Sequence, residues 1–110
     1  RFLDKNNEAV TPIGASLSHI STINVTNVHP KLGDIKFSIA CDVSNPLYGL
    51  NGAAYIYAAQ KGASLEDIRM LDKGLSGFSK IINAVFNVDA QSIKGAGAAG
   101  GMGIASKVFL

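Results

Sequence analysis

The sequence predicts an α+β fold, in which a mixed-sheet α/β domain is built around one long amphipathic helix. Apolar residues recur at every second position over 35–43 and at every third or fourth position over 65–85. The first period is that of a half-buried strand, and the second is that of a helix with one buried face. A chain of 110 residues holds one core, so we expect residues 1–110 to form a single domain.

Composition narrows the class of protein. The chain is 47% hydrophobic and 16% charged, which excludes a disordered segment and indicates that something covers part of its surface. Its net charge of +2 is spread along the chain, which excludes a basic nucleic-acid-binding surface. No apolar run approaches the roughly 18 residues of a membrane span. We therefore expect a cytoplasmic protein with neither a nucleic-acid nor a membrane partner.

The first third of the chain predicts short elements. Residues 2–10 have two apolar segments around an Asn-rich turn, which predicts a β-hairpin. Apolar spacings of four and three predict a short helix over 15–20. The brief alternation around Ile23 and Val25 suits either a strand or an extended loop.

Residues 35–43 give the strongest strand prediction. Ile35, Phe37, Ile39, Cys41 and Val43 alternate with more polar neighbours, so one face of the strand is apolar. Cys41 then belongs to the buried face and is expected to be an inert core thiol. Asp42 follows on the opposite face, at the C-terminal end of the strand.

The second half predicts helices. Residues 53–59 are small and apolar and suit either a short helix or a buried strand. Ser64 with Asp67 forms a capping-box pattern, and the apolar stripe that follows predicts a helix of about six turns. Gly74 and Gly77 lie inside it, which indicates close packing against another backbone.

The most conspicuous motif is the Gly/Ala run at 95–103. Gly95, Gly97 and Gly100 spell G-x-G-x-x-G, but no strand precedes them and no acidic residue follows at the required distance. The run therefore predicts either tight packing or contact with an anion, at the start of a helix over 98–110.

Two further positions are candidates for chemistry. Asp42 and Asn45 flank a turn and can hold a substrate hydroxyl or Mg²⁺, although Asp42 can equally fasten its own turn. Lys61 precedes the capped helix, where a flexible ammonium suits a phosphate or carboxylate, although most lysines are simply solvated. His19 and His29 have no further ligands at zinc spacing.

Three blocks then coincide in order and spacing, at 41–53, 60–63 and 95–103. Together they resemble the bacterial type I glycerate kinase family, which phosphorylates D-glycerate with ATP. The resemblance implies that the chain is a central portion of a two-domain α/β kinase, the smaller domain, which lines an interdomain active-site cleft and is inactive alone. One departure is at 57–59, where the family has a Phe-Gly-Pro-like triplet and this chain has Tyr-Ala-Ala.

The resemblance also implies roles, since phosphoryl transfer depends on positioning and charge neutralisation. The expected catalytic residues are Lys61, which pairs with a carboxylate or phosphate, and Asp42, which binds Mg²⁺ or accepts the hydroxyl proton. The remaining expected contacts are with substrate, through Asn45, Gly49, Gly52 and Gln60, and with phosphate or another anion, through Gly95, Gly97, Gly100 and Gly101. The expected cofactors are ATP and Mg²⁺, and the expected partners are D-glycerate and the remaining domain of the kinase.

One alternative stays open, a non-catalytic module that binds a small molecule or anion with the same Gly-rich turn. An open reading frame bounded near Arg1 and Leu110 would favour it. The lack of an initiator Met and of a polar tail instead leads us to expect a fragment of a longer protein.

Overall fold

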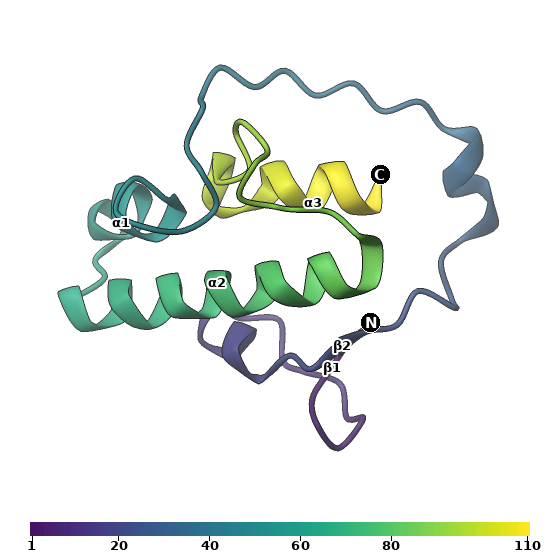
Figure 1. Ribbon diagram of the computed structural model, residues 1–110, viewed down its shortest axis with the longest axis horizontal. Helices are drawn as coiled ribbons and strands as arrows, with labels where there is room; N and C mark the ends of the chain where they lie inside the picture. The colour runs from purple at the N-terminus through teal and green to yellow at the C-terminus, as the bar shows by residue number, and fades with distance from the viewer.

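The computed structural model describes all 110 residues, and it confirms the α+β class (Figure 1). Two short strands and three α-helices are joined by four 3₁₀ turns, labelled η. In chain order the elements are β1 (Phe2–Leu3), η1 (Gly14–His19), β2 (Thr22–Ile23), η2 (Pro30–Asp34), α1 (Ala53–Tyr57), η3 (Ala59–Lys61), α2 (Leu65–Phe86), η4 (Ala98–Gly100) and α3 (Met102–Phe109).

The N-terminal segment folds as the sequence predicts. The predicted hairpin is present, since Leu3 and Ala9 form an antiparallel bridge and the Val10 amide donates to the Phe2 carbonyl at 3.0 Å. The predicted short helix is the 3₁₀ turn η1. β2 then pairs antiparallel with β1, with Phe2 opposite Ile23. These two strands form the whole sheet of this chain.

Helix α2 is the centre of the fold, and its predicted start is confirmed. The Ser64 hydroxyl accepts from the Asp67 amide, and the Asp67 carboxylate accepts from the Ser64 amide. Asn87 ends the helix in the left-handed region at φ 54°. Of the two glycines inside α2, Gly74 packs closely, because an added Cβ would lie 3.1 Å from the Leu17 Cβ. The same expectation is wrong for Gly77, which has open space around it.

The core lies on both sides of α2. The β-strands and η1 contact one side of the helix, and α1 contacts another (Figure 1). Leu47, Ile82 and Ile104 are the largest fully buried side chains. Helix α3 joins this core through aromatic contacts, since the Phe109 ring meets Phe86 and Phe2 edge-on, with centroids 5.5 and 5.9 Å apart.

The predicted strand at 35–43 is wrong for this structure. Residues 35–43 belong to no helix or strand and follow an arc away from the helices (Figure 1). The apolar alternation is present, but a strand also needs a neighbour for its backbone hydrogen bonds, and these residues have none. Cys41 is therefore exposed, so the expectation of a core thiol is also wrong.

Residues 53–59 resolve into helix, since α1 covers Ala53–Tyr57 and buries Ala53 and Ala54. The predicted C-terminal helix is divided. Gly101, at φ 109°, separates the turn η4 from α3. No helix in the structure is both long and apolar enough to span a membrane.

Candidate functional site

The three sequence blocks meet at one end of the fold. The Gly97 amide donates to the Asn45 carbonyl at 3.0 Å, which joins the third block to the first. Lys61 and Gly100 line one small cavity of about 180 Å³, together with Tyr57 and Leu71, which joins the second block to the third. Asn45 and Gly97, which are 52 positions apart in the sequence, are thus brought together.

Asn45 organises the loop that follows it. Its side-chain oxygen accepts from the Tyr57 hydroxyl at 2.8 Å, and its amide nitrogen donates to the Asn51 carbonyl at 3.2 Å. The loop is therefore tied to α1 and closed on itself. Two positions of this loop require glycine. Gly49 has a φ of 95°, which residues with a side chain rarely adopt, and a Cβ on Gly52 would collide with the Tyr48 backbone.

Two further side chains hold this loop, and the sequence reasoning missed both. The Asp72 carboxylate on α2 accepts from the Gly49 amide at 2.8 Å. The Gln91 amide nitrogen donates to the Tyr48 carbonyl at 3.0 Å. Asp72 lies between Leu71 and Lys73, in a part of α2 with several charged residues, and no sequence signal marked it. Gln91 lies in a polar segment that gave no signal.

The Gly/Ala run packs against the loop at 43–46. A Cβ on Gly97 would collide with the Pro46 carbonyl, and one on Gly95 would lie 3.0 Å from the Val43 oxygen and 3.1 Å from the Cys41 sulfur. Both glycines are buried. Their lack of side chains is therefore what lets the first and third blocks approach.

Most amides of this run are already engaged. Those of Gly97, Gly100 and Gly101 donate to the carbonyls of Asn45, Gly97 and Ala98. The amides of Met102 and Gly103, in the first turn of α3, donate to no group of the protein. These two amides, which the sequence reasoning did not select, point along the helix toward its N-terminal end.

Lys61 ends η3 and is exposed, as is its neighbour Gln60. Gly62 follows at φ 89°, which turns the chain into the Ser64 cap of α2. Lys61 thus stands between the small cavity and the N-terminus of α2. The positive end of a helix dipole and an ammonium both favour an anion at such a place.

Close to Lys61 in the sequence, the cap of α2 holds the Asp67 carboxyl group in two hydrogen bonds. The Ser64 hydroxyl donates to the Asp67 carboxylate at 2.6 Å, and the Ser64 amide donates to it at 2.9 Å. These two hydrogen bonds, the hydroxyl first, lower the pKa of Asp67 below its ordinary value of 3.8.

Asp42 lies in the segment at 35–43, which belongs to no helix or strand. It is exposed on the extended segment, and its side chain forms no hydrogen bond, so it does not fasten its own turn. No group of three or more His, Cys, Asp or Glu side chains comes together as a metal centre. A single free carboxylate nevertheless suits Mg²⁺, which binds one or two protein carboxylates and takes its other ligands from phosphates and water.

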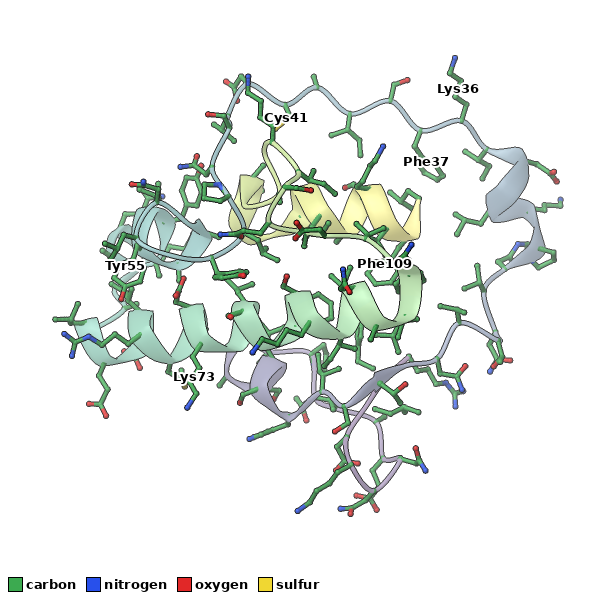
Figure 2. All side chains as sticks on the ribbon, in the orientation of Figure 1. Lys36, Phe37, Cys41, Tyr55, Lys73 and Phe109 are labelled. Atoms are coloured by element: carbon green, nitrogen blue, oxygen red, sulfur yellow. The ribbon has the colours of Figure 1, made fainter.

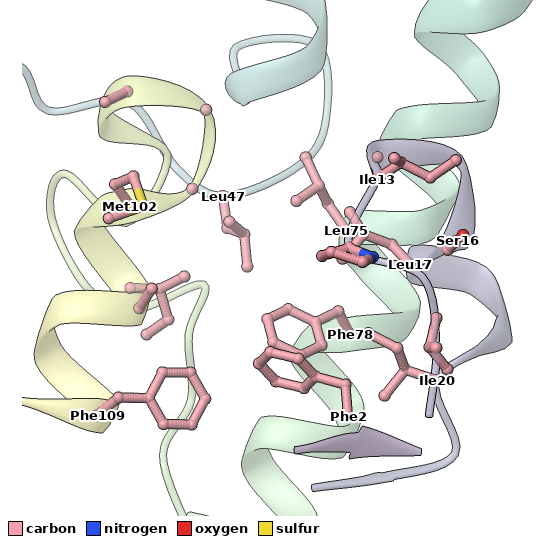
Figure 3. Close-up of a pocket in the computed structure, with 18 of the residues that line it drawn as sticks. Phe2, Ile13, Ser16, Leu17, Ile20, Leu47, Leu75, Phe78, Met102 and Phe109 are labelled. Atoms are coloured by element: carbon pink, nitrogen blue, oxygen red, sulfur yellow. The ribbon is translucent and has the colours of Figure 1, made fainter. Parts of the chain in front are cut away.

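A larger cavity of about 490 Å³ lies between α2, α3 and η1 (Figure 3). Figure 3 shows Phe78 and Phe2 on one side of it and Met102 and Phe109 on the other. Its lining is mostly hydrophobic, so it offers few of the polar groups that a small charged substrate needs. The small cavity is also lined mostly by hydrophobic residues, but its lining includes Lys61, a cation that can pair with a charged substrate.

Comparisons with known proteins give one consistent result. The family model "Glycerate kinase family" matches residues 1–110. Glycerate 2-kinase of Escherichia coli (strain K12) and glycerate kinase of Halalkalibacterium halodurans are each 42% identical over 110 residues. A solved structure, "putative glycerate kinase 2 from Salmonella typhimurium LT2", matches 99% of the chain with a TM-score of 0.94 and 35% identity.

The match covers nearly all of this chain but only part of each relative. It covers 100% of this chain but 29% of each of the two curated relatives, and 29% of the solved structure. The relatives are therefore more than three times as long as the 110 residues described above. The identity over the full chain and the shared backbone leave no doubt about descent: the chain belongs to the glycerate kinase family.

Proposed function

We propose that this chain forms one wall of the active-site cleft in an enzyme that transfers the γ-phosphoryl group of ATP to D-glycerate. The convergence of its three family-like blocks at one end of the fold supports this proposal most directly. The hydrogen bond from Gly97 to Asn45 and the cavity shared by Lys61 and Gly100 define that end. The second wall comes from the remaining part of the kinase, and the cytoplasm, where ATP is supplied, is the proposed location.

In this proposal a glycerate hydroxyl oxygen bonds to the γ-phosphorus, and the bond from that phosphorus to the ADP oxygen breaks. The chain's residues position the groups and neutralise charge. Lys61 pairs with the glycerate carboxylate or a nucleotide phosphate. Its exposure beside the N-terminus of α2 supports this role, because the ammonium is free to move toward an anion there.

Asp42 is proposed to bind Mg²⁺ or to accept the proton of the reacting hydroxyl. Its free carboxylate supports either role. Mg²⁺, when bound, supplies neutralisation of the phosphate charge. Without a hydrogen-bonded partner in the chain, Asp42 keeps all its lone pairs for ligand or proton.

Asn45 is proposed to orient the substrate, together with the loop glycines Gly49 and Gly52 and with Gln60. Its two hydrogen bonds fix the side chain, yet the oxygen keeps one lone pair and the nitrogen one hydrogen for a ligand. A side chain held in this way loses little freedom when it binds, which favours precise orientation.

Gly95, Gly97, Gly100 and Gly101 are proposed to shape an anion site at the start of α3. Three of their own amides already donate within the chain. We therefore propose that these glycines let the backbone pack closely enough to hold the start of α3 at the site, and that the amides of Met102 and Gly103 donate to the phosphate.

The test is a phosphorylation assay with D-glycerate, ATP and Mg²⁺, on the full-length protein that contains this chain and on the 110-residue chain alone. We expect phosphoglycerate from the full-length protein and none from the chain alone, because the cleft needs both walls. A full-length protein that folds but phosphorylates no glycerate would refute the proposed activity. Full activity from the 110 residues alone would refute the shared cleft.

A further inference from the structure

The extended segment at 35–43 has an unpaired backbone on both edges. Residues 36–44 neither donate nor accept any backbone–backbone hydrogen bond, although 58 such bonds are present in the structure. The only bond to their backbone is a thiol contact of 3.4 Å from Cys41 to the Val43 carbonyl. Since successive residues of a strand point their N–H and C=O groups to opposite edges, two neighbouring strands can pair with this segment.

Apolar and more polar side chains of the segment alternate between two faces, as in a half-buried strand. Figure 2 shows Phe37 pointing toward the side on which α3 lies and Lys36 pointing away from it. Phe37 is 40% exposed, while Ile35 and Ile39 are 53% and 57% exposed. An alternating apolar face that remains exposed indicates a surface that another element covers.

The surface of the whole chain agrees with this reading. Its accessible area is 7302 Å², whereas a compact monomer of this mass has about 5,800 Å². The sheet formed within the chain has two strands of two residues each. A sheet of this size has marginal stability by itself. The longest strand-like segment of the chain, at 35–43, takes no part in it.

The longer relatives indicate where the partner comes from. The solved structure shares this backbone over 99% of the chain with a TM-score of 0.94, so segment 35–43 lies within the matched part. Most of that solved protein lies outside the match. The same path of the backbone is thus adopted inside a polypeptide with ample further chain.

We propose that residues 35–43 form an interior strand of a sheet whose neighbouring strands come from the remaining part of the same kinase polypeptide. The neighbours pair with both edges of the segment and extend its apolar face over α3. The inference rests on the proposed function only in that it places this chain within a longer kinase. Residues 35–43 would then be the seam, the strand through which this chain joins the remaining part of the polypeptide.

Amide hydrogen exchange of the full-length protein tests the seam without reference to catalysis. Residues 36–43 should be protected by roughly a hundredfold or more over unstructured rates, as paired strands are. The core of α2 gives the protected standard. Lys5 and Asn27 give the unprotected standard, because each is exposed and its amide donates to nothing. Exchange at 36–43 as fast as at Lys5 and Asn27 would overturn the proposal.

The exchange is repeated over a concentration series, with the oligomeric state measured alongside. Protection that is independent of concentration supports a partner within the same polypeptide. Protection that appears only as dimers form would assign the neighbouring strand to a second copy and overturn the proposal. Protection in a protein that lacks glycerate kinase activity would leave the seam standing and refute the proposed function alone.

A matched pair of substitutions tests the apolar face. Ile39→Thr and Lys36→Thr both introduce a residue with high strand propensity, one on each face. Ile39→Thr should lower the Tm of the full-length protein by several degrees, and Lys36→Thr should leave it unchanged, because only the first loses buried apolar contact. Equal effects of the two substitutions would contradict a covered inner face.

Discussion

The carboxylate of Asp72, in the first half of α2, accepts a hydrogen bond of 2.8 Å from the backbone amide of Gly49. This bond fixes the loop at 45–52 to the longest helix of the molecule. Asn45 secures the same loop from the side of α1. The loop proposed to hold substrate is therefore supported from two helices, and its position depends on side chains outside the family-like blocks.

The first prediction concerns this support. On the proposed function, Asp72→Ala in the full-length protein should lower kcat/KM for glycerate about tenfold, because a hydrogen bond to a charged group contributes about 1.5–3 kcal/mol. Asp72→Asn should restore part of the loss, since its side-chain oxygen still accepts from Gly49. Steady-state kinetics measure both. Equal activity of wild type and Asp72→Ala would show that the loop holds its position without this bond.

The second prediction concerns close approach of backbones. Gly97→Ala should strongly destabilise the protein, because its Cβ would collide with the Pro46 carbonyl. Gly77→Ala is the matched control, since it has open space and a helical position. It should stabilise by about 0.5–1 kcal/mol. Denaturant unfolding compares the two, and a tolerated Gly97→Ala would show that the loop at 43–46 can withdraw.

The third prediction concerns the α2 cap. An NMR titration should give Asp67 a pKa below 3.8, and Ser64→Ala should raise it toward that value by removing the hydroxyl donor. Because the folded-state pKa is lowered, the ionised Asp67 carboxylate stabilises the fold at pH values above its ordinary pKa. That contribution is lost as the pH falls through the folded-state pKa. An Asp67 pKa unaffected by Ser64→Ala would assign the shift to another cause.

The fourth prediction concerns Asp42. Asp42→Asn in the full-length protein should lower kcat/KM for glycerate about tenfold or more, and it should raise the Mg²⁺ concentration needed for half-maximal rate if Asp42 binds the metal. Asp34→Asn, an exposed carboxylate in η2, is the control and should behave as wild type. If the kcat falls while the Mg²⁺ dependence is unchanged, Asp42 acts as the base.

Local patterns predicted the elements that depend only on local physics. Ser64 and Asp67 are three residues apart and satisfy each other's amides, so the start of α2 followed from the sequence. The strand at 35–43 did not form, because a strand is completed by neighbours and the alternation of its residues says nothing of whether they are present. The bond of Asp72 to Gly49 spans 23 residues, and no periodicity reports such a pairing.

The candidate site shows the same limit of local patterns. Residue types selected Lys61, Asn45 and the glycine run as candidates. In the fold Gly97 bonds to Asn45, and Gly100 lines the same small cavity as Lys61. The glycines were expected to offer their amides to an anion, yet the Gly97 amide donates to the Asn45 carbonyl. Which amides have no hydrogen-bond acceptor within the chain depends on the path of the backbone between η4 and α3. That path cannot be predicted from composition.

The most direct test of this account measures kcat/KM for D-glycerate in the full-length protein with Lys61→Ala, beside Lys73→Ala. Lys73 is exposed on α2, on the side away from α3 (Figure 2). We predict a loss of at least about tenfold for Lys61→Ala, equal to ~1.4 kcal/mol of transition-state stabilisation, and wild-type kinetics for Lys73→Ala. Wild-type kinetics for a folded Lys61→Ala protein would contradict the proposed site.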